Sequence, residues 1–128
     1  CIGLRGDLGT GKTFFVRAFL HALGYRGRVK SPSFSLLEAY QVGGMPVFHL
    51  DLYRLAEPRE VDYLGLTDLE WSAGVLLIEW PERGAGHLPR LDLELRLEHL
   101  GMGRRARLVA LTRKGRELLS MLAQPERD

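Results

Sequence analysis

Residues 6–13, with the sequence G-D-L-G-T-G-K-T, carry the clearest chemical signal in the chain. They match the pattern G-x-x-x-x-G-K-[ST], in which glycines let the backbone wrap tightly and turn successive N–H groups inward. Those donors, with the N-terminal end of a following helix, form a concave anion site. Lys12 is expected to reach the β- and γ-phosphates of a nucleotide, and the Thr13 hydroxyl to ligate Mg²⁺. The pattern therefore predicts a site for a nucleotide and its metal ion.

Such a phosphate-binding loop needs an acidic group on the Mg²⁺ side, usually at the end of an apolar strand. Two acids fit this requirement: Asp51 ends the segment 47–51, and Glu79 directly follows the four apolar residues 75–78. Because ligands gather beyond the carboxyl ends of strands in open α/β sheets, both carboxylates are expected to face the phosphates. Glu79 is the preferred Mg²⁺ ligand, and Asp51 is expected to bind the metal through water or to orient the attacking water.

Three features near these acids each have two interpretations. His49 lies two residues before Asp51 on the same strand face, where a structural histidine is preferred over a general base. Residues 31–34, S-P-S-F, occupy the position of a switch segment that a γ-phosphate would order, although a simple proline turn explains them equally well. Trp80, beside Glu79, suits either the core or a contact surface.

The elements around the loop have the order that this chemistry requires. Residues 1–5 predict a short strand that enters the loop, and residues 14–23 predict an amphipathic helix that leaves it. The helix is expected to end at Gly24, a residue type that suits the C′ position. Strand, loop and helix together predict that the loop binds phosphate.

The remainder of the chain alternates predicted strands with short helices. Strands are expected at residues 35–42, 46–52, 75–78, 91–97 and 105–111. Gly43 and Gly44 join the first two too tightly for a parallel crossover, so that pair is expected to run antiparallel. Helices are expected at residues 57–64, at residues 67–71 behind a T-x-x-E capping box, and at residues 113–122; a Gly/Pro-rich loop covers residues 83–89.

Length and composition indicate one ordinary globular domain. The chain has 128 residues, of which 45% are hydrophobic and 27% charged, and its net charge of +2 selects no nucleic-acid or membrane partner. The lone cysteine, Cys1, excludes an internal disulfide and a multi-cysteine zinc site, and it fits a cytoplasmic setting. No apolar run approaches the length of a membrane span. Residues 1–123 are expected to form the domain, without its native N-terminal segment, and residues 124–128 a frayed tail.

The fold class follows from these elements. We expect an α/β three-layer sandwich of the P-loop NTPase type, with helices on both faces of a mixed sheet that has a parallel core and antiparallel strands. No internal repeat and no low-complexity segment interrupts this pattern.

Four motifs occur in one order: G-D-L-G-T-G-K-T at 6–13, S-P-S-F at 31–34, H-L-D-L-Y-R-L at 49–55 and L-I-E-W-P-E at 77–82. Together they resemble the TsaE (YjeE) family, the small bacterial P-loop ATPases of tRNA threonylcarbamoyladenosine (t6A) biosynthesis. The resemblance spans residue 2 to about residue 81. It implies a protein that binds ATP and Mg²⁺ and docks on the TsaB–TsaD heterodimer, TsaD in particular. Its ATP hydrolysis is implied to support repeated t6A formation without transferring the threonylcarbamoyl group, so that its action on tRNA is indirect.

The resemblance assigns roles to individual residues. Lys12 and Thr13 match the P-loop lysine and the Mg²⁺-binding threonine of the family. Ser33 stands where the family's switch has threonine, and its hydroxyl keeps a contact to phosphate or metal. Family members also carry an N-terminal segment that packs near the nucleotide base. This chain lacks that segment, so adenine contacts are expected to be incomplete and nucleotide binding weak.

The predicted site combines the motif residues with the two acids. Asp51 falls with Tyr53 and Arg54 on the family's H-x-D-x-Y-R motif, and Glu79 with Trp80 on its E-W motif. The predicted catalytic residues are Lys12, Asp51 and Glu79, and the predicted metal ligands are Thr13, Glu79 and Asp51. The predicted nucleotide-binding residues are Asp7, Leu8, Gly9, Thr10, Gly11, Lys12, Thr13, Phe14 and Ser33.

Other functions share part of this pattern. A small-molecule kinase would have the same loop and acids but needs an arginine lid, for which Arg83 with residues 84–86 is a thin candidate. A GTPase is disfavoured because no N-K-x-D motif is present. A nucleotide-gated binding module with almost no hydrolysis of its own is a third possibility. Basic clusters at residues 104–107 and 113–116 give no specific support for direct tRNA binding, because solvated faces explain them equally well.

Overall fold

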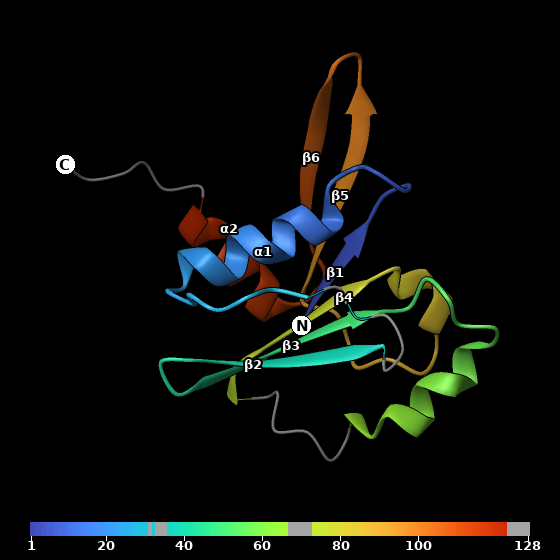
Figure 1. The fold of residues 1–128 in the computed structure, drawn as a ribbon. Coiled ribbons are helices and arrows are strands. Elements are labelled where there is room, and N and C mark those ends of the chain that lie inside the picture. Colours follow the sequence, from blue (N-terminus) through green and yellow to red (C-terminus); the bar gives the residue numbers. More distant parts are fainter. Residues whose placement is uncertain (31, 33–35, 67–72, 123–128) are drawn as a thin grey trace.

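A six-stranded mixed sheet forms the centre of the computed structural model, which describes residues 1–30, 32, 36–66 and 73–122. The strand order is β2-β3-β4-β1-β5-β6 (Figure 1). The bounds are β1 (Ile2–Arg5), β2 (Leu37–Val42), β3 (Met45–Asp51), β4 (Val75–Glu79), β5 (Leu93–Leu100) and β6 (Gly103–Ala110). Strands β3, β4, β1 and β5 run parallel, whereas β2 and β6 pair antiparallel at the two edges. The predicted mixed sheet with a parallel core is therefore confirmed.

Helix α1 (Lys12–Ala22) covers one face of the sheet and begins two residues earlier than predicted. Its Val16 and Leu20 are fully buried in a cluster with the strand residues Leu4 and Leu77. The helix ends as expected at Gly24, whose φ of 101° lies in the left-handed region. The adjoining N–H of residue 25 donates to the carbonyl of Leu20 at 3.0 Å, which is the Schellman arrangement.

The opposite face is covered by short 3₁₀ helices in place of α-helices. The helix η1 (Pro58–Leu64) coincides with the predicted helix at 57–64, and its proline occupies the first turn as expected. A second 3₁₀ helix, η4 (Pro81–Gly84), takes up the start of the segment that the sequence predicted as a loop. The core on this side includes Leu50, Val61 and Ile78. The helix predicted at residues 67–71 lies outside the described residues.

The strands of the core and the first hairpin agree with the sequence pattern. Three consecutive residues of β4, Leu76 to Ile78, are fully buried, as a strand covered on both faces requires. In the β2–β3 hairpin, Val42 pairs with Met45 across a loop of two glycines. Both glycines have positive φ, at 55° and 83°, which suits the tight turn of an antiparallel pair.

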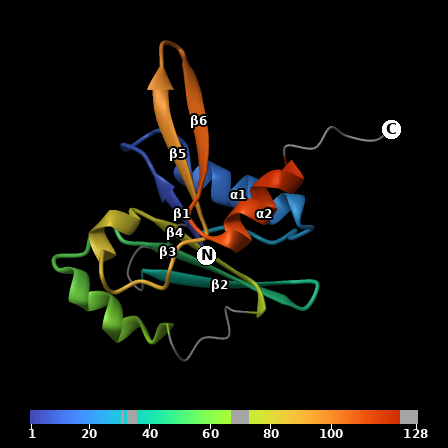
Figure 2. The same ribbon diagram turned by 180° about the vertical axis from the view of Figure 1, so that it is seen from behind.

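The β5–β6 hairpin is longer than the sequence predicted and extends away from the body of the molecule (Figures 1 and 2). Pairing runs from Leu93 with Ala110 to Leu100 with Gly103 at the exposed tip. Helix α2 (Arg113–Leu122) follows with the predicted bounds and packs beside β6. Within the part of the chain that the structure describes, no helix has both the length and the apolar character needed to cross a membrane.

Candidate functional site

The loop at residues 6–13 connects β1 to α1 and depends on its glycines for its shape. A Cβ at Gly6 would lie 2.5 Å from the carbonyl oxygen of Leu97, so no other residue fits there without movement of the backbone. Gly9 and Gly11 have φ values of 79° and 104°, a region that other residues rarely adopt. No side chain caps the N-terminus of α1, and its first turn contains no acidic residue. The helix N–H groups and the positive end of its dipole are therefore left for an anionic ligand.

A cleft of about 280 Å³ opens above this loop. It is lined by Asp7, Leu8, Gly9, Thr10, Gly11, Lys12, Thr13, Phe14, Asp51, Tyr53, Glu79 and Trp80. The structure thus brings together every residue that the sequence nominated for the site except Ser33, which lies outside the described residues together with most of the S-P-S-F segment. Residues separated by more than sixty positions in the chain meet here because β4 lies directly beside β1.

Lys12 is buried and folds back on its own loop. Its Nζ donates to the backbone carbonyl oxygens of Gly6 and, at 3.1 Å, of Asp7. The same Nζ lies 3.9 Å from the ring centroid of Trp80. Burial lowers the pKa of the Lys12 ammonium, although the carboxylates around it, Glu79 first among them, act in the opposite direction. A phosphate group in the cleft would favour the charged form of this buried ammonium.

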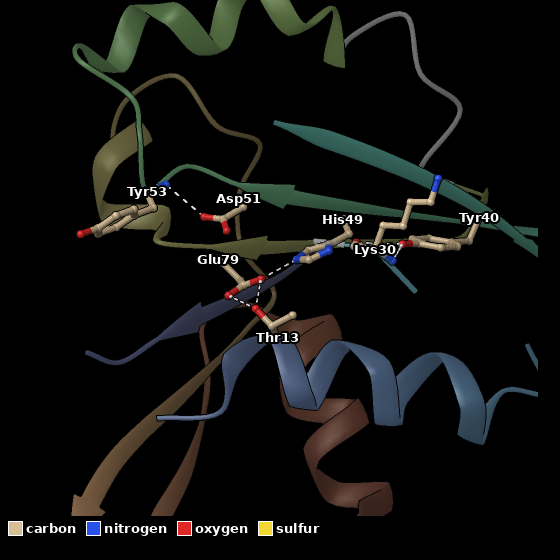
Figure 3. Close-up of polar contacts among 7 residues, drawn as sticks. All are labelled: Thr13, Lys30, Tyr40, His49, Asp51, Tyr53 and Glu79. Atoms are coloured by element: carbon tan, nitrogen blue, oxygen red, sulfur yellow. Dashed lines mark hydrogen bonds and ion pairs between the residues drawn. The ribbon is translucent and has the colours of Figure 1, made fainter. Parts of the chain in front are cut away.

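Thr13, Glu79 and His49 form a chain of polar contacts that leads from the cleft into the interior (Figure 3). The Thr13 hydroxyl donates to the Glu79 carboxylate, with both oxygens 3.2 Å away. On the other side, Nε2 of His49 lies 2.6 Å from Oε2 of Glu79. Glu79 is 2% exposed and His49 is fully buried. The carboxylate at the end of β4 is therefore fixed next to the loop threonine by two partners from different elements.

The contact between His49 and Glu79 is a feature that sequence reasoning missed. Nδ1 of His49 is buried and has no hydrogen-bond partner among the described residues. Because an ionised carboxylate only accepts hydrogen bonds, Nε2 of His49 carries a proton and donates it to Glu79. The preference for a structural histidine captured its burial. The only signal in the sequence that His49 contacts an acid was the strand alternation, which places residues 49 and 51 on the same face.

We expect His49→Leu to lower the free energy of unfolding by about 2 kcal/mol, because a buried carboxylate loses a donor. His49→Gln keeps an N–H donor and should recover part of that loss. Urea denaturation of both variants measures the difference. His87→Leu is the matched control: its contact with Asp62, at 3.1 Å, is solvent-exposed, and its removal should cost less than about 0.5 kcal/mol. Equal losses for the two leucine variants would contradict a specific role for His49.

Asp51 ends β3 and is the register partner of Glu79 on the neighbouring strand. Its Oδ1 accepts the backbone N–H of Tyr53 at 3.1 Å. Burial raises the pKa of the Asp51 carboxyl, and the nearby charge of Glu79 raises it further. Within the described residues no ion pair joins Asp51 to Arg54, the alternative role that the sequence left open. Asp51 therefore presents a second carboxylate to the cleft beside Glu79.

Trp80 lies at the edge of the cleft with one side toward the core and the other toward Lys12. Its backbone has a φ of 59°, an uncommon conformation for a large residue. The ring centroid of Tyr53 is 5.1 Å away, and the guanidinium of Arg83 lies 5.0 Å from the Tyr53 ring and 5.4 Å from the Trp80 ring. Trp80 thus contacts both the core and the open cleft, the two environments that the sequence allowed. Arg83 packs on the Tyr53 and Trp80 rings at the rim of the cleft.

The donor set fits a magnesium ion that is shared with a phosphate ligand. In the described part of the chain, no group of three or more His, Cys, Asp and Glu side chains is placed to enclose a metal ion by itself. Mg²⁺ in phosphate-transfer sites is usually held by one or two protein oxygens, with phosphates and water completing the octahedron. The Thr13 hydroxyl and the Glu79 carboxylate provide such oxygens, and Asp51 lies within the same cleft.

Comparison with known proteins identifies the family. A family model described as "Threonylcarbamoyl adenosine biosynthesis protein TsaE" matches residues 1–107. The chain belongs to the TsaE family. A relative from Haemophilus influenzae, named tRNA threonylcarbamoyladenosine biosynthesis protein TsaE, is 40% identical over 117 residues, which cover 91% of this chain and 74% of the relative. The protein of the same name from Bacillus subtilis is 37% identical over 98 residues, which cover 77% of this chain and 61% of the relative.

A solved structure shows that the fold of this TsaE-family chain also occurs in a known protein. The crystal structure of Bacillus subtilis YdiB is similar with a TM-score of 0.78 and 29% sequence identity, and the match covers 95% of this chain and 75% of that one. The resemblance inferred from four short motifs and the predicted α/β fold are both confirmed. The family model also extends beyond residue 82, where the motifs end, into the β5–β6 hairpin.

Proposed function

We propose that this TsaE-family chain binds ATP with Mg²⁺ in the cleft at residues 6–13 and hydrolyses the ATP. The observation that carries the proposal is the contact between the Thr13 hydroxyl and Glu79 at the uncapped N-terminus of α1. This contact supports the proposal because hydroxyl and carboxylate oxygens are ligands that Mg²⁺ accepts, and they lie beside free helix N–H groups that suit a phosphate. The helix N-terminus alone would support only phosphate binding, and the oxygen pair alone would support only cation binding.

Each residue has a distinct task in this proposal. The loop N–H groups and Lys12 hold the phosphates, and Thr13 with Glu79 would hold the metal ion. The bound Mg²⁺ would neutralise phosphate charge during transfer. Asp51, at the neighbouring strand end, orients the water that attacks the γ-phosphate or binds the metal through water. His49 keeps the Glu79 carboxylate directed at Thr13.

The proposed biological role is tRNA threonylcarbamoyladenosine biosynthesis, acting with the TsaB–TsaD heterodimer. It is supported by the names of the relatives, which state that pathway. A partner that covers the cleft is supported by two apolar residues at its rim: Leu8 is 63% exposed and Phe14 is 70% exposed. A docked protein would remove this apolar surface from water.

The test is ATP hydrolysis measured with the chain alone and with TsaB–TsaD added. We expect slow turnover alone and an increase of tenfold or more with the heterodimer, because a docked partner would order the open cleft. Turnover that ignores the heterodimer would contradict the role in t6A biosynthesis. Transfer of the γ-phosphate to a small acceptor in a substrate screen would support the kinase alternative.

A further inference from the structure

Arg104 links the β5–β6 hairpin to the phosphate-binding loop. It lies near the start of β6, and its guanidinium donates twice to the tip of the loop. Nε donates to the carbonyl of Thr10 and Nη2 to the carbonyl of Gly9, both at 3.2 Å. Along the chain, Arg104 is 94 residues from Thr10 and 95 residues from Gly9. The loop that follows β1 lies beside the hairpin in both views of the fold (Figures 1 and 2).

The two bonds act on the outer side of the loop. A phosphate-binding loop directs its N–H groups inward, so its carbonyl groups are left to point away from the ligand. Arg104 satisfies two of these carbonyls and does not line the cleft itself. The planar guanidinium group presents two N–H donors in a fixed geometry that suits two neighbouring carbonyls. The ammonium group of a lysine does not offer this geometry.

The other hydrogen bonds at the tip come from within the loop, where the backbone N–H and Oγ1 of Thr10 donate to the carbonyl of Asp7 at 3.3 and 2.8 Å. A Cβ built at Gly9 or at Gly11 would meet no atom within 4 Å apart from those of the neighbouring residues, so the space beside both positions is open. Glycine also has more conformations to lose when a segment is ordered. A loop of this kind binds an anion tightly only if its shape is fixed before the ligand arrives.

We propose that Arg104 is a positioning residue for nucleotide binding, which fixes the tip of the phosphate-binding loop through the Gly9 and Thr10 carbonyls. The proposal rests on the proposed function of the cleft as a nucleotide site. It assigns the C-terminal hairpin a part in that site, although the hairpin contributes no residue to the cleft lining.

The adjacent residue provides a matched control. Arg105 has the same charge and lies on the opposite face of β6, where it pairs with Glu98 at 3.5 Å. Both of these side chains are at least half exposed, so the pair is worth little. Removing Arg105 changes the net charge of the hairpin by the same amount as removing Arg104 but leaves the loop contacts intact.

The experiment compares Arg104→Ala, Arg104→Lys and Arg105→Ala in the full chain. Dissociation constants for Mg²⁺–ADP and steady-state ATP hydrolysis are measured for each. We expect Arg104→Ala to raise the dissociation constant and KM about tenfold, equivalent to about 1.4 kcal/mol, with kcat within about twofold of the native value. Arg104→Lys should recover part of the affinity, and Arg105→Ala should match the native chain.

Several results would overturn the inference. If Arg104→Ala binds Mg²⁺–ADP within twofold of the native affinity, the contact does not contribute to nucleotide binding. If Arg105→Ala loses as much affinity as Arg104→Ala, the cause is a general effect of charge. A fall in kcat with unchanged KM also contradicts loop positioning. If Arg104→Ala does not fold, the lysine variant decides: a folded Arg104→Lys chain with native affinity contradicts loop positioning as well. If the native chain binds no nucleotide and matches Lys12→Ala, the proposed function itself fails, and this inference fails with it.

Discussion

Replacing Lys12 with alanine is expected to lower ATP hydrolysis at least 100-fold and to weaken nucleotide binding by 10-fold or more. Lys12 is the buried cation of the cleft, and its Nζ already lies beside the loop carbonyls and the Trp80 ring. Charged hydrogen bonds to phosphate are among the strongest in proteins, at about 1.5–3 kcal/mol each. Loss of one or two of them accounts for the expected change in affinity.

The same substitution is expected to leave the folded state intact. Burial lowers the pKa of Lys12, which means that folding disfavours its protonated form. Below its ordinary pKa this group therefore makes an unfavourable contribution to stability, and its removal relieves that cost. Thermal unfolding of the nucleotide-free variant should occur at or slightly above the native temperature. A variant that loses activity because it unfolds would contradict the assignment of Lys12 to ligand binding.

Glu79→Gln is expected to reduce Mg²⁺-dependent hydrolysis at least 100-fold while nucleotide binding without metal changes less than threefold. The amide keeps the size of the side chain beside Thr13 and His49 but removes the negative charge that a metal ligand needs. Hydrolysis rates across a Mg²⁺ titration, with affinities measured in chelator, separate the two effects. Glu82→Gln is the control, since Glu82 is exposed and lies on η4 just after the site.

The Asp51→Asn variant tests which of the two acids, Asp51 or Glu79, is the Mg²⁺ ligand. If Glu79 is the metal ligand, Asp51→Asn should lower kcat with a smaller shift in the Mg²⁺ requirement than Glu79→Gln produces. A larger shift for Asp51→Asn would reverse the assignment. Both carboxylates lie in the same cleft at adjacent strand ends, so the measurement compares two groups in nearly equivalent positions.

The sequence was most informative where local pattern determines structure. The glycines of the loop, the apolar run before Glu79 and the C′ position of Gly24 each follow from the conformational needs of a few neighbouring residues. Those needs predicted the phosphate loop, the buried strand and the end of α1. They also nominated the cleft residues that the structure brings together.

The contacts that could not be predicted join residues distant in the chain. Arg104 reaches the loop, and His49 reaches Glu79, only because the sheet places the β5–β6 hairpin and β3 on opposite sides of the β1–β4 pair. No local pattern encodes that strand order. The hairpin was predicted too short for a related reason: its outer half is held by backbone pairing and carries many exposed residues, so burial periodicity fades there.

The central position of β1 has a consequence for how the chain folds during its synthesis. Ile2–Arg5 precedes both of its sheet neighbours, which end at Glu79 and Leu100. At about 5–20 residues per second, β1 emerges from the ribosome roughly 5–20 s before β5 is available to pair with it. Until then the unpaired backbone groups along its edges are open to the wrong partners, a hazard that chaperones relieve. The phosphate-binding loop is translated before the β5–β6 hairpin, so the bonds from Arg104 to Gly9 and Thr10 can form only after the hairpin has been made.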